Sequence, residues 1–301
     1  MWKWLSCVTV AAACAGPPSK LACTDPAGCV VTLADGQGSP NTIAVDPNAV
    51  YWNGKDGIMK SGLDGAGLTQ LVAGSAAALA IDDTYVYWTD GAMISRVAKA
   101  GGAAQVLASG GSSISALAVD ANAVYFTAKD ELGRVAKTGG AATMLAPIGQ
   151  PYPFQVAVDA TAVYWVDTGD TTVNQVGFDG GAPTRLATAR SGGGIAVDDA
   201  AIYWASCTGG ADGGIVKLVR GATTLAPLST DSRCPLGITL DDNSVYWTDY
   251  SGSRVMRTPL AGGTTDVLAA DQPAPSAIAV DATSVYWTDV DAGTVMVRTP
   301  K

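Results

Sequence analysis

One short motif recurs along almost the whole chain, and it limits the possible folds more than any other feature. The motif is Val-Tyr-Trp-Thr-Asp at residues 245–249, and seven variants of it occur. Their tyrosines recur at intervals of 36 to 43 residues: Tyr51, Tyr87, Tyr125, Tyr164, Tyr203, Tyr246 and Tyr286. A repeat of about 40 residues with one aromatic strand in each copy is typical of a β-propeller. The sequence therefore predicts an all-β, seven-bladed β-propeller of four-stranded antiparallel blades.

Each unit divides into four strand-like pieces, which are clearest between residues 237 and 269. The first piece, 237–240, has a small side chain in its middle and ends at Asp241. The second piece is the aromatic motif, the third is 254–257 before a glycine-rich turn, and the fourth is 266–269. Because side chains alternate along a strand, Tyr246 lies on one face and Trp247 on the other. Both faces are apolar, so we expect blades stacked face to face, with the first piece lining a central channel.

The last unit has no fourth piece, because the sequence ends at Lys301. A matching apolar piece precedes the first unit at residues 30–34. We therefore expect residues 277–299 and 30–34 to form blade seven together, which closes the ring without an open edge. The predicted organisation is a signal peptide at 1–13, a linker at 14–29 and a propeller at 30–301.

The N-terminal residues 1–13 combine one lysine, a short apolar run and small residues, as a short signal peptide does. The run Ala11-Ala12-Ala13-Cys14 resembles the lipobox of bacterial lipoproteins, which implies lipidation of Cys14. Plain cleavage, giving a soluble periplasmic or secreted protein, is the alternative. We expect an exported protein, either lipid-anchored to the bacterial envelope or periplasmic or extracellular. It would meet the membrane only through this lipid.

Four cysteines lie after Cys14, and an exported protein is expected to pair them. Cys23 and Cys29 bracket a Pro-Gly turn, so we predict a disulfide between them. Cys207 follows the aromatic strand of blade five, and Cys234 precedes the first strand of blade six. In a propeller both positions lie on the same face of neighbouring blades, so Cys207–Cys234 is the second predicted disulfide.

Composition excludes several classes of function. The formal net charge is −9, so a nucleic-acid partner is not expected. The chain contains no histidine, which removes Ser-His and Cys-His nucleophiles and zinc sites built on histidine. Glu131 is the only glutamate. We expect no cofactor, with calcium as the one ion that aspartate oxygens could bind.

The run Tyr246-Trp247-Thr248-Asp249, followed by Gly252, Arg254-Val255 and Arg257, resembles the YWTD repeat of low-density-lipoprotein-receptor class B propellers. Tyr87 to Asp90 and Tyr286 to Asp289 match the same pattern. The resemblance implies a propeller blade and extends over residues 30–301. That family normally closes six blades and carries flanking EGF-like modules, whereas this chain has seven repeats and no such module. A receptor role is therefore not carried over.

The last residue of the aromatic motif falls on the face that carries the loops between blades. Four aspartates occupy this position, Asp90, Asp167, Asp249 and Asp289, and Tyr152 and Tyr250 lie in adjacent loops. One hypothesis is a rim that binds a cation, a cationic ligand or a partner. The other is that each aspartate bonds to loop amides, as turn aspartates do. These six residues are the predicted ligand- or partner-binding residues, and no catalytic or metal-binding residue is predicted.

Two functions agree with these observations. The first is an exported, monomeric, non-enzymatic propeller that acts as an interaction scaffold at the bacterial envelope for an unknown protein or small ligand. The alternative is a lactonase- or lyase-like propeller enzyme with a metal or ligand at the top of the central channel. The tidy repeats and the missing histidine favour the first, although a fold does not fix a function.

Overall fold

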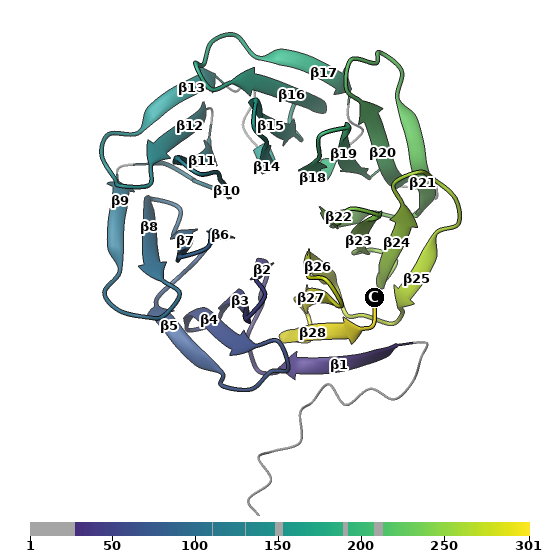
Figure 1. The fold of residues 1–301 in the computed structure, drawn as a ribbon, viewed down its shortest axis with the longest axis horizontal. Coiled ribbons are helices and arrows are strands. Elements are labelled where there is room, and N and C mark those ends of the chain that lie inside the picture. Colours follow the sequence, from purple (N-terminus) through teal and green to yellow (C-terminus); the bar gives the residue numbers. More distant parts are fainter. Residues whose placement is uncertain (1–27, 110, 130, 148–152, 189–191, 208–212) are drawn as a thin grey trace, which may run out of the picture.

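The computed structural model describes residues 28–301 except 110, 130, 148–152, 189–191 and 208–212. In it, 28 strands form seven separate four-stranded antiparallel sheets arranged as a ring (Figure 1). The first strand of each sheet lies nearest the centre and the fourth lies at the rim (Figure 1). The predicted fold class is confirmed, with seven blades as the sequence repeats indicated. Within the described residues, no helix is long and apolar enough to cross a membrane.

The blades follow one another along the chain, and the strands of the first six run in chain order from the centre outwards. Blade one contains β2 (Ile43–Val45), β3 (Ala49–Gly54), β4 (Gly57–Gly62) and β5 (Thr69–Ala73), and blade two contains β6 (Ala78–Ile81), β7 (Tyr85–Thr89), β8 (Met93–Ala98) and β9 (Gln105–Ser109). Blade three contains β10 (Ala116–Val119), β11 (Ala123–Ala128), β12 (Glu131–Ala136) and β13 (Thr143–Pro147), and blade four contains β14 (Pro153–Val158), β15 (Ala162–Asp167), β16 (Thr172–Gly177) and β17 (Thr184–Thr188). Blade five contains β18 (Gly192–Val197), β19 (Ala201–Ser206), β20 (Gly213–Val219) and β21 (Ala226–Ser232), and blade six contains β22 (Pro235–Leu240), β23 (Ser244–Asp249), β24 (Arg254–Pro259) and β25 (Asp266–Ala269).

Blade seven joins the two ends of the described chain. It contains β26 (Pro275–Val280), β27 (Val285–Asp289) and β28 (Thr294–Thr299), and its outer strand is β1 (Cys29–Ala34). β1 pairs antiparallel with β28, with Val31 opposite Val297, and the two strands lie side by side in Figure 1. The N-terminal strand therefore completes the last blade, as the sequence predicts. This pairing covers the edge of β28 and gives blade seven the same four strands as the other blades.

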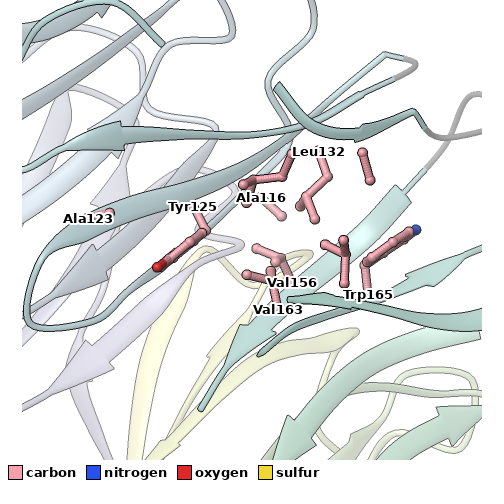
Figure 2. Packing of buried hydrophobic residues seen from close by; sticks show 10 residues of the cluster. Ala116, Ala123, Tyr125, Leu132, Val156, Val163 and Trp165 are labelled. Carbon is pink, nitrogen blue, oxygen red and sulfur yellow. The ribbon is translucent and has the colours of Figure 1, made fainter. Parts of the chain in front are cut away.

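The core consists of seven apolar clusters, one at each boundary between neighbouring blades. In each cluster the motif tyrosine of one blade packs against the second strand of the next blade. Figure 2 shows this cluster for blades three and four, with Tyr125 at one end, Trp165 at the other, and Val156 and Val163 between them. β23 is buried along its whole length because blade five covers one of its faces and blade seven the other. The two apolar faces of the motif are thus explained by stacking on both sides.

A second repeated contact lies on the face of the ring that carries the turns between the first and second strands. The aspartate that opens this turn accepts hydrogen bonds from two turn amides, as Asp82 does from Thr84 and Tyr85. Its other carboxylate oxygen accepts the hydroxyl of the motif tyrosine, from Tyr87 at 2.8 Å. Tyr51, Tyr125, Tyr203, Tyr246 and Tyr286 bond to their own aspartates in the same way. One carboxylate therefore holds both the conformation of the turn and the position of the tyrosine side chain in the core.

At four blade boundaries a cation of the next blade binds the same aspartate. Lys137 of blade three reaches Asp82 of blade two at 2.7 Å. The other three pairs are Lys99–Asp46, Arg220–Asp159 and Lys301–Asp241. At the remaining boundaries apolar side chains occupy this place: Phe178 against Tyr125, Leu260 beside blade five and Leu63 beside blade seven. Neighbouring blades are therefore joined by ion pairs in some places and by apolar packing in others.

Replacement of a motif tryptophan tests the core. Trp247 is fully buried at the boundary with blade five. We expect Trp247→Ala to lower the free energy of unfolding by about 3–5 kcal/mol, because the cavity left behind loses apolar contacts. Urea unfolding followed by circular dichroism measures this loss. A loss below about 1 kcal/mol would contradict tight packing of the indole between the blades.

The ion pair of Asp82 makes stability depend on acid pH. Burial opposes ionisation of Asp82, but the hydrogen bonds from Lys137, the turn amides and Tyr87 outweigh it and lower the pKa to about 2. The ionised form therefore adds stability above pH 4, which is lost as the pH falls towards 2. We expect Lys137→Met to cost roughly 1–2 kcal/mol at pH 6 and less at pH 2. The exposed Lys129 makes no ion pair within the described residues, so Lys129→Met is the matched control; equal losses for both variants would refute the prediction.

Candidate functional site

A cavity of about 310 Å³ lies at one mouth of the central channel, on the face where the first strands begin. Residues at the starts of six first strands line it. The strands are those of blades one, two, three, four, six and seven. The lining residues are Asn41, Thr42, Ile43, Ala77, Ala78, Leu79, Ser115, Ala116, Leu117, Gln155, Leu236, Gly237, Ile238, Ser276, Ala277 and Ile278. None of them carries a charge.

Amide and hydroxyl groups supply the polar part of the wall. Asn41 accepts a hydrogen bond from Asn53 at 2.8 Å, and Ser115 bonds to Thr127 and to the carbonyl of Pro153. Within the described residues, the side-chain NH₂ groups of Asn41 and Gln155 donate to no protein acceptor. Since each NH₂ group carries two donors, these side chains can bond to a ligand in the cavity.

Glycines allow the wall of the cavity to close tightly next to Gln155. The Oε1 atom of Gln155 accepts the amide of Ile195 at 2.9 Å, which links blades four and five. A Cβ atom at Gly194 would lie 2.2 Å from this oxygen. A Cβ atom at Gly237 would lie 2.3 Å from the carbonyl oxygen of Ser276, which also accepts Thr248 Oγ1 at 2.6 Å. The close approaches of Gln155 to Gly194 and of Ser276 to Gly237 therefore leave no room for a side chain at either glycine.

The predicted aspartates lie on the same face as the cavity mouth, in four different blades. Asp90 is exposed and accepts the amides of Ala92 and Met93, which lower the pKa of its carboxyl. Asp167 is buried and accepts the amides of Gly169 and Asp170. Burial raises the pKa of Asp167, although those two amides favour its charged form. Both side chains bond within their own loops, and a ligand-binding role for them stays a prediction.

Asp249 is the most completely hydrogen-bonded of the four. Its Oδ1 atom accepts the amides of Arg233 and Cys234 at 3.1 Å and of Gly252 at 3.2 Å. Its Oδ2 atom pairs with the guanidinium of Arg254 at 2.7 Å. Arg254 also donates to the carbonyl of Asp231. This carboxylate is fully buried and joins the loop before β22 to the loop after β23.

Asp289 has the same place in blade seven and a different environment. It is 1% exposed, and its Oδ1 atom has no hydrogen-bond partner among the described residues. The indole of Trp287 donates to Gln272 Oε1 at 3.0 Å. Burial raises the pKa of Asp289 to about 7, with the nearby indole N–H of Trp287 lowering it in part. Burial therefore favours the neutral form of this carboxyl.

One of the two predicted disulfides lies wholly within the described residues. Cys207 and Cys234 form a disulfide with an S–S distance of 2.13 Å, which confirms that pairing. Cys29 is disulfide-bonded, but Cys23, its predicted partner, lies outside the described residues, as do Cys14 and Tyr152. Tyr250 is 40% exposed next to the disulfide, with its amide bonded to the Cys234 carbonyl. Ligand binding by the two tyrosines stays a prediction.

No metal site emerges from the described part of the chain. It contains no group of three or more Cys, Asp or Glu side chains that could hold an ion. The four motif aspartates are thus not brought together into a calcium-binding cluster there. Calcium binding stays an untested prediction.

Comparisons with known proteins give structural likeness alone. No family model matches the chain, and no curated protein matches it significantly. Virginiamycin B lyase from Staphylococcus aureus superimposes with a TM-score of 0.75 at 16% identity, over 90% of this chain and 98% of that one. A catalytically inactive variant of that lyase, solved with quinupristin, gives 0.75 at 17% identity over the same shares. A chain of a nidogen/laminin complex gives 0.61 at 22% identity, over 72% of this chain and 89% of that one.

These likenesses require a correction. The sequence analysis favours a protein that is not an enzyme. That prediction is contradicted, because virginiamycin B lyase, an enzyme, shares this arrangement of blades along 90% of the chain. Regular repeats report how blades pack and do not exclude catalysis at their ends. At these identities the comparisons show the fold and leave the specific YWTD class unassigned.

The residues that line the cavity were not predicted from the sequence. Asn41, Ser115 and Ser276 each lie two residues before the apolar residue that pairs opposite the motif aromatic. An alignment of the seven repeats at this position would have shown polar side chains in three blades. The aspartates were preferred as candidates because their charge is the more visible feature of the sequence.

The ion pair of Asp249 provides a test of this face. We expect Arg254→Met to cost about 2–3 kcal/mol, because it leaves a buried carboxylate without its cation. Arg257→Met is the matched control: Arg257 pairs with Asp266, which is 46% exposed, and its loss should cost less than about 1 kcal/mol. Chemical unfolding of both variants at pH 7 measures the difference. Equal costs would show that Asp249 does not depend on Arg254.

Proposed function

We propose that this protein is an exported ligand-binding propeller that takes an uncharged, amide-containing ligand, such as a peptide segment, into the mouth of its central channel. The uncharged, mixed polar and apolar lining of the 310 Å³ cavity carries this proposal. A charged ligand would lose its hydration there without gaining a counter-ion. Export, with a lipid at Cys14 or simple cleavage, follows from the N-terminal sequence and is part of the proposal.

The lining matches the groups of a peptide. Asn41 and Gln155 offer free NH₂ donors on blades one and four, on different sides of the ring. Leu236, Ile238 and Ile278 offer apolar contact on blades six and seven. Most binding sites for small ligands combine such an apolar wall with a few convergent polar groups. The protein would thus act as an interaction module at the bacterial envelope, as a monomer, with a small ligand or a segment of a partner protein.

A lyase reaction in the same cavity is the second candidate. It is supported by the likeness to virginiamycin B lyase over nearly the full length of both chains. The chain contains no histidine, so any proton transfer would use a carboxyl, tyrosine or lysine side chain. None of these is among the residues that line the cavity, so the acid or base would come from the surrounding loops.

Binding can be tested with quinupristin and with short peptides blocked at both ends. We expect at least one of the blocked peptides, chosen with neutral side chains, to bind, with heat measured by calorimetry and a raised melting temperature. Ala77 is exposed at the cavity mouth, so Ala77→Trp should weaken binding at least tenfold by filling the entrance. Ala121→Trp, at an exposed turn on the opposite face, is the matched control and should bind as the parent does.

The same samples separate the two candidates. Mass spectrometry of quinupristin after incubation detects a change of its covalent structure, which supports a lyase. Binding without such a change supports the interaction module. If neither quinupristin nor the blocked peptides bind at millimolar concentration, the proposed ligand class is wrong. Equal weakening by Ala77→Trp and Ala121→Trp would show that the ligand does not bind at the channel mouth.

A further inference from the structure

The boundary between blades six and seven contains a buried carboxyl that lacks the partners of its counterpart one blade earlier. We call this boundary the 6–7 seam: residues 272–274, the side chains of Trp287 and Asp289, and the loop 290–293. The 5–6 seam is its equivalent: residues 232–234, Trp247 and Asp249, and the loop 250–253. In both seams an amide of the later loop bonds back to the earlier segment, from Val290 to Ala274 and from Tyr250 to Cys234, each at 3.1 Å. The two backbones are therefore alike.

Sequence differences remove two of the partners that Asp249 has, the amide of Arg233 and the guanidinium of Arg254, and add a side chain at a third position. Pro273 stands where Arg233 donates its amide, and proline has no N–H. Thr294 stands where Arg254 supplies the cation. Ala292 stands at Gly252, where a Cβ atom would lie 2.1 Å from the Asp249 carboxylate. Asp289 is nevertheless 1% exposed, so its Oδ1 atom has neither a partner among the described residues nor contact with bulk solvent.

The charged groups around the 6–7 seam do not neutralise Asp289. Asp291 in its own loop and Asp271 before Gln272 are exposed and carry the same charge. From blade six, Ser253 contributes its carbonyl to the amide of Gln272, and the adjacent Arg254 is paired with Asp249. From the segment before blade one, Gln37 donates its amide to the carbonyl of Gly293, with Asp35 exposed two residues before it. The exposed Lys55 donates its amide to the Gln37 carbonyl and is in none of the ion pairs among the described residues. None of the ion pairs among the described residues includes Asp289.

The 6–7 seam continues into the wall of the cavity. Asp289 pairs opposite Pro275 at the start of β26, and the next residues, Ser276 and Ala277, line the cavity. The amide of Ala277 donates to the hydroxyl of Thr288, the neighbour of Asp289, at 3.1 Å. A displacement of residues 272–274 would therefore move one side of the cavity.

We propose that Asp289 is a proton-operated latch of the 6–7 seam, which keeps residues 272–277 in place while it is protonated and loosens them when it ionises. An ionised carboxylate in this position needs water or a cation, and neither reaches Oδ1 unless the segment over it moves away. On ionisation the proton passes to solvent, and on closure it returns. The latch is a property of the seam itself, and its effect on a ligand in the cavity rests on the proposed function.

The direction of the pH dependence follows from the pKa of about 7, against an ordinary value of 3.8. A carboxyl whose pKa is raised in the folded state stabilises the fold most at low pH, and this contribution is lost as the pH rises from the ordinary value through 7. We expect the melting temperature of Asp289→Asn, relative to the parent, to rise by about 5 °C between pH 5 and pH 8. Differential scanning calorimetry of both proteins measures this change.

Two further measurements keep the proposal testable if Asp289→Asn folds poorly. The double variant Ala292→Gly, Thr294→Arg copies the surroundings of Asp249 into blade seven. Between pH 5 and pH 8 the parent should lose more stability than Asp289→Asn, and the double variant should remove most of this difference. In the parent, hydrogen exchange of residues 272–278, corrected for the intrinsic effect of pH, should accelerate at least tenfold between pH 6 and pH 8. Residues 232–238 of the 5–6 seam serve as the internal reference.

Parallel pH curves for the parent and both variants would refute the latch, as would equal exchange in the two seams. The effect on the cavity is measured separately, as quinupristin affinity at pH 6 and pH 8 for the parent and Asp289→Asn. Weaker binding at pH 8 in the parent alone supports control of the cavity. Intact pH-dependent exchange without binding of quinupristin or the blocked peptides would leave the latch standing and count against the proposed ligand.

Discussion

The structure depends on the burial of one strand in each blade from both sides. The motif tyrosine packs into one neighbouring blade and the motif tryptophan into the other, so no blade can bury its core alone. Because each blade needs two neighbours, the ring has to close, and β1 makes the closure by pairing with β28. The tyrosine hydroxyl then bonds to the turn aspartate, which couples the apolar packing to the shape of the hairpin.

Variation between blades is confined to the ends of this repeated unit. On the face with the turn aspartates, four boundaries carry ion pairs and the others carry apolar contacts, such as Phe178 on Tyr125. On the other face, the position after the motif threonine is occupied by aspartates with different partners. Asp249 is held by a cation and three amides, whereas Asp289 is buried without a partner at Oδ1 among the described residues. The packing that defines the fold tolerates both, because the carboxyl lies beyond the apolar cluster.

The cavity at the channel mouth and the 6–7 seam belong to the same side of the ring. The cavity has an uncharged lining, which suits a neutral ligand, and its wall includes residues that follow directly from the seam. The cavity and the buried carboxyl of Asp289 are therefore connected through one short segment, 272–277. The similar lyase structures show that this arrangement of blades supports catalysis in other proteins, and the fold by itself assigns no reaction to this chain.

The sequence by itself determined the number of blades, the four strands of each, the N-terminal closing strand and the Cys207–Cys234 disulfide. All of these follow from spacing along the chain, since a repeated motif of alternating apolar residues allows few arrangements. The sequence also located the motif aspartates on the loop face. It did not distinguish Asp249 from Asp289, because their difference lies in Pro273 and Thr294, and only the fold shows that these two residues replace partners of the carboxylate. The cavity likewise required the tertiary structure: Asn41, Ser115, Gln155 and Ser276 come from four blades, and only closure of the ring brings them around one space.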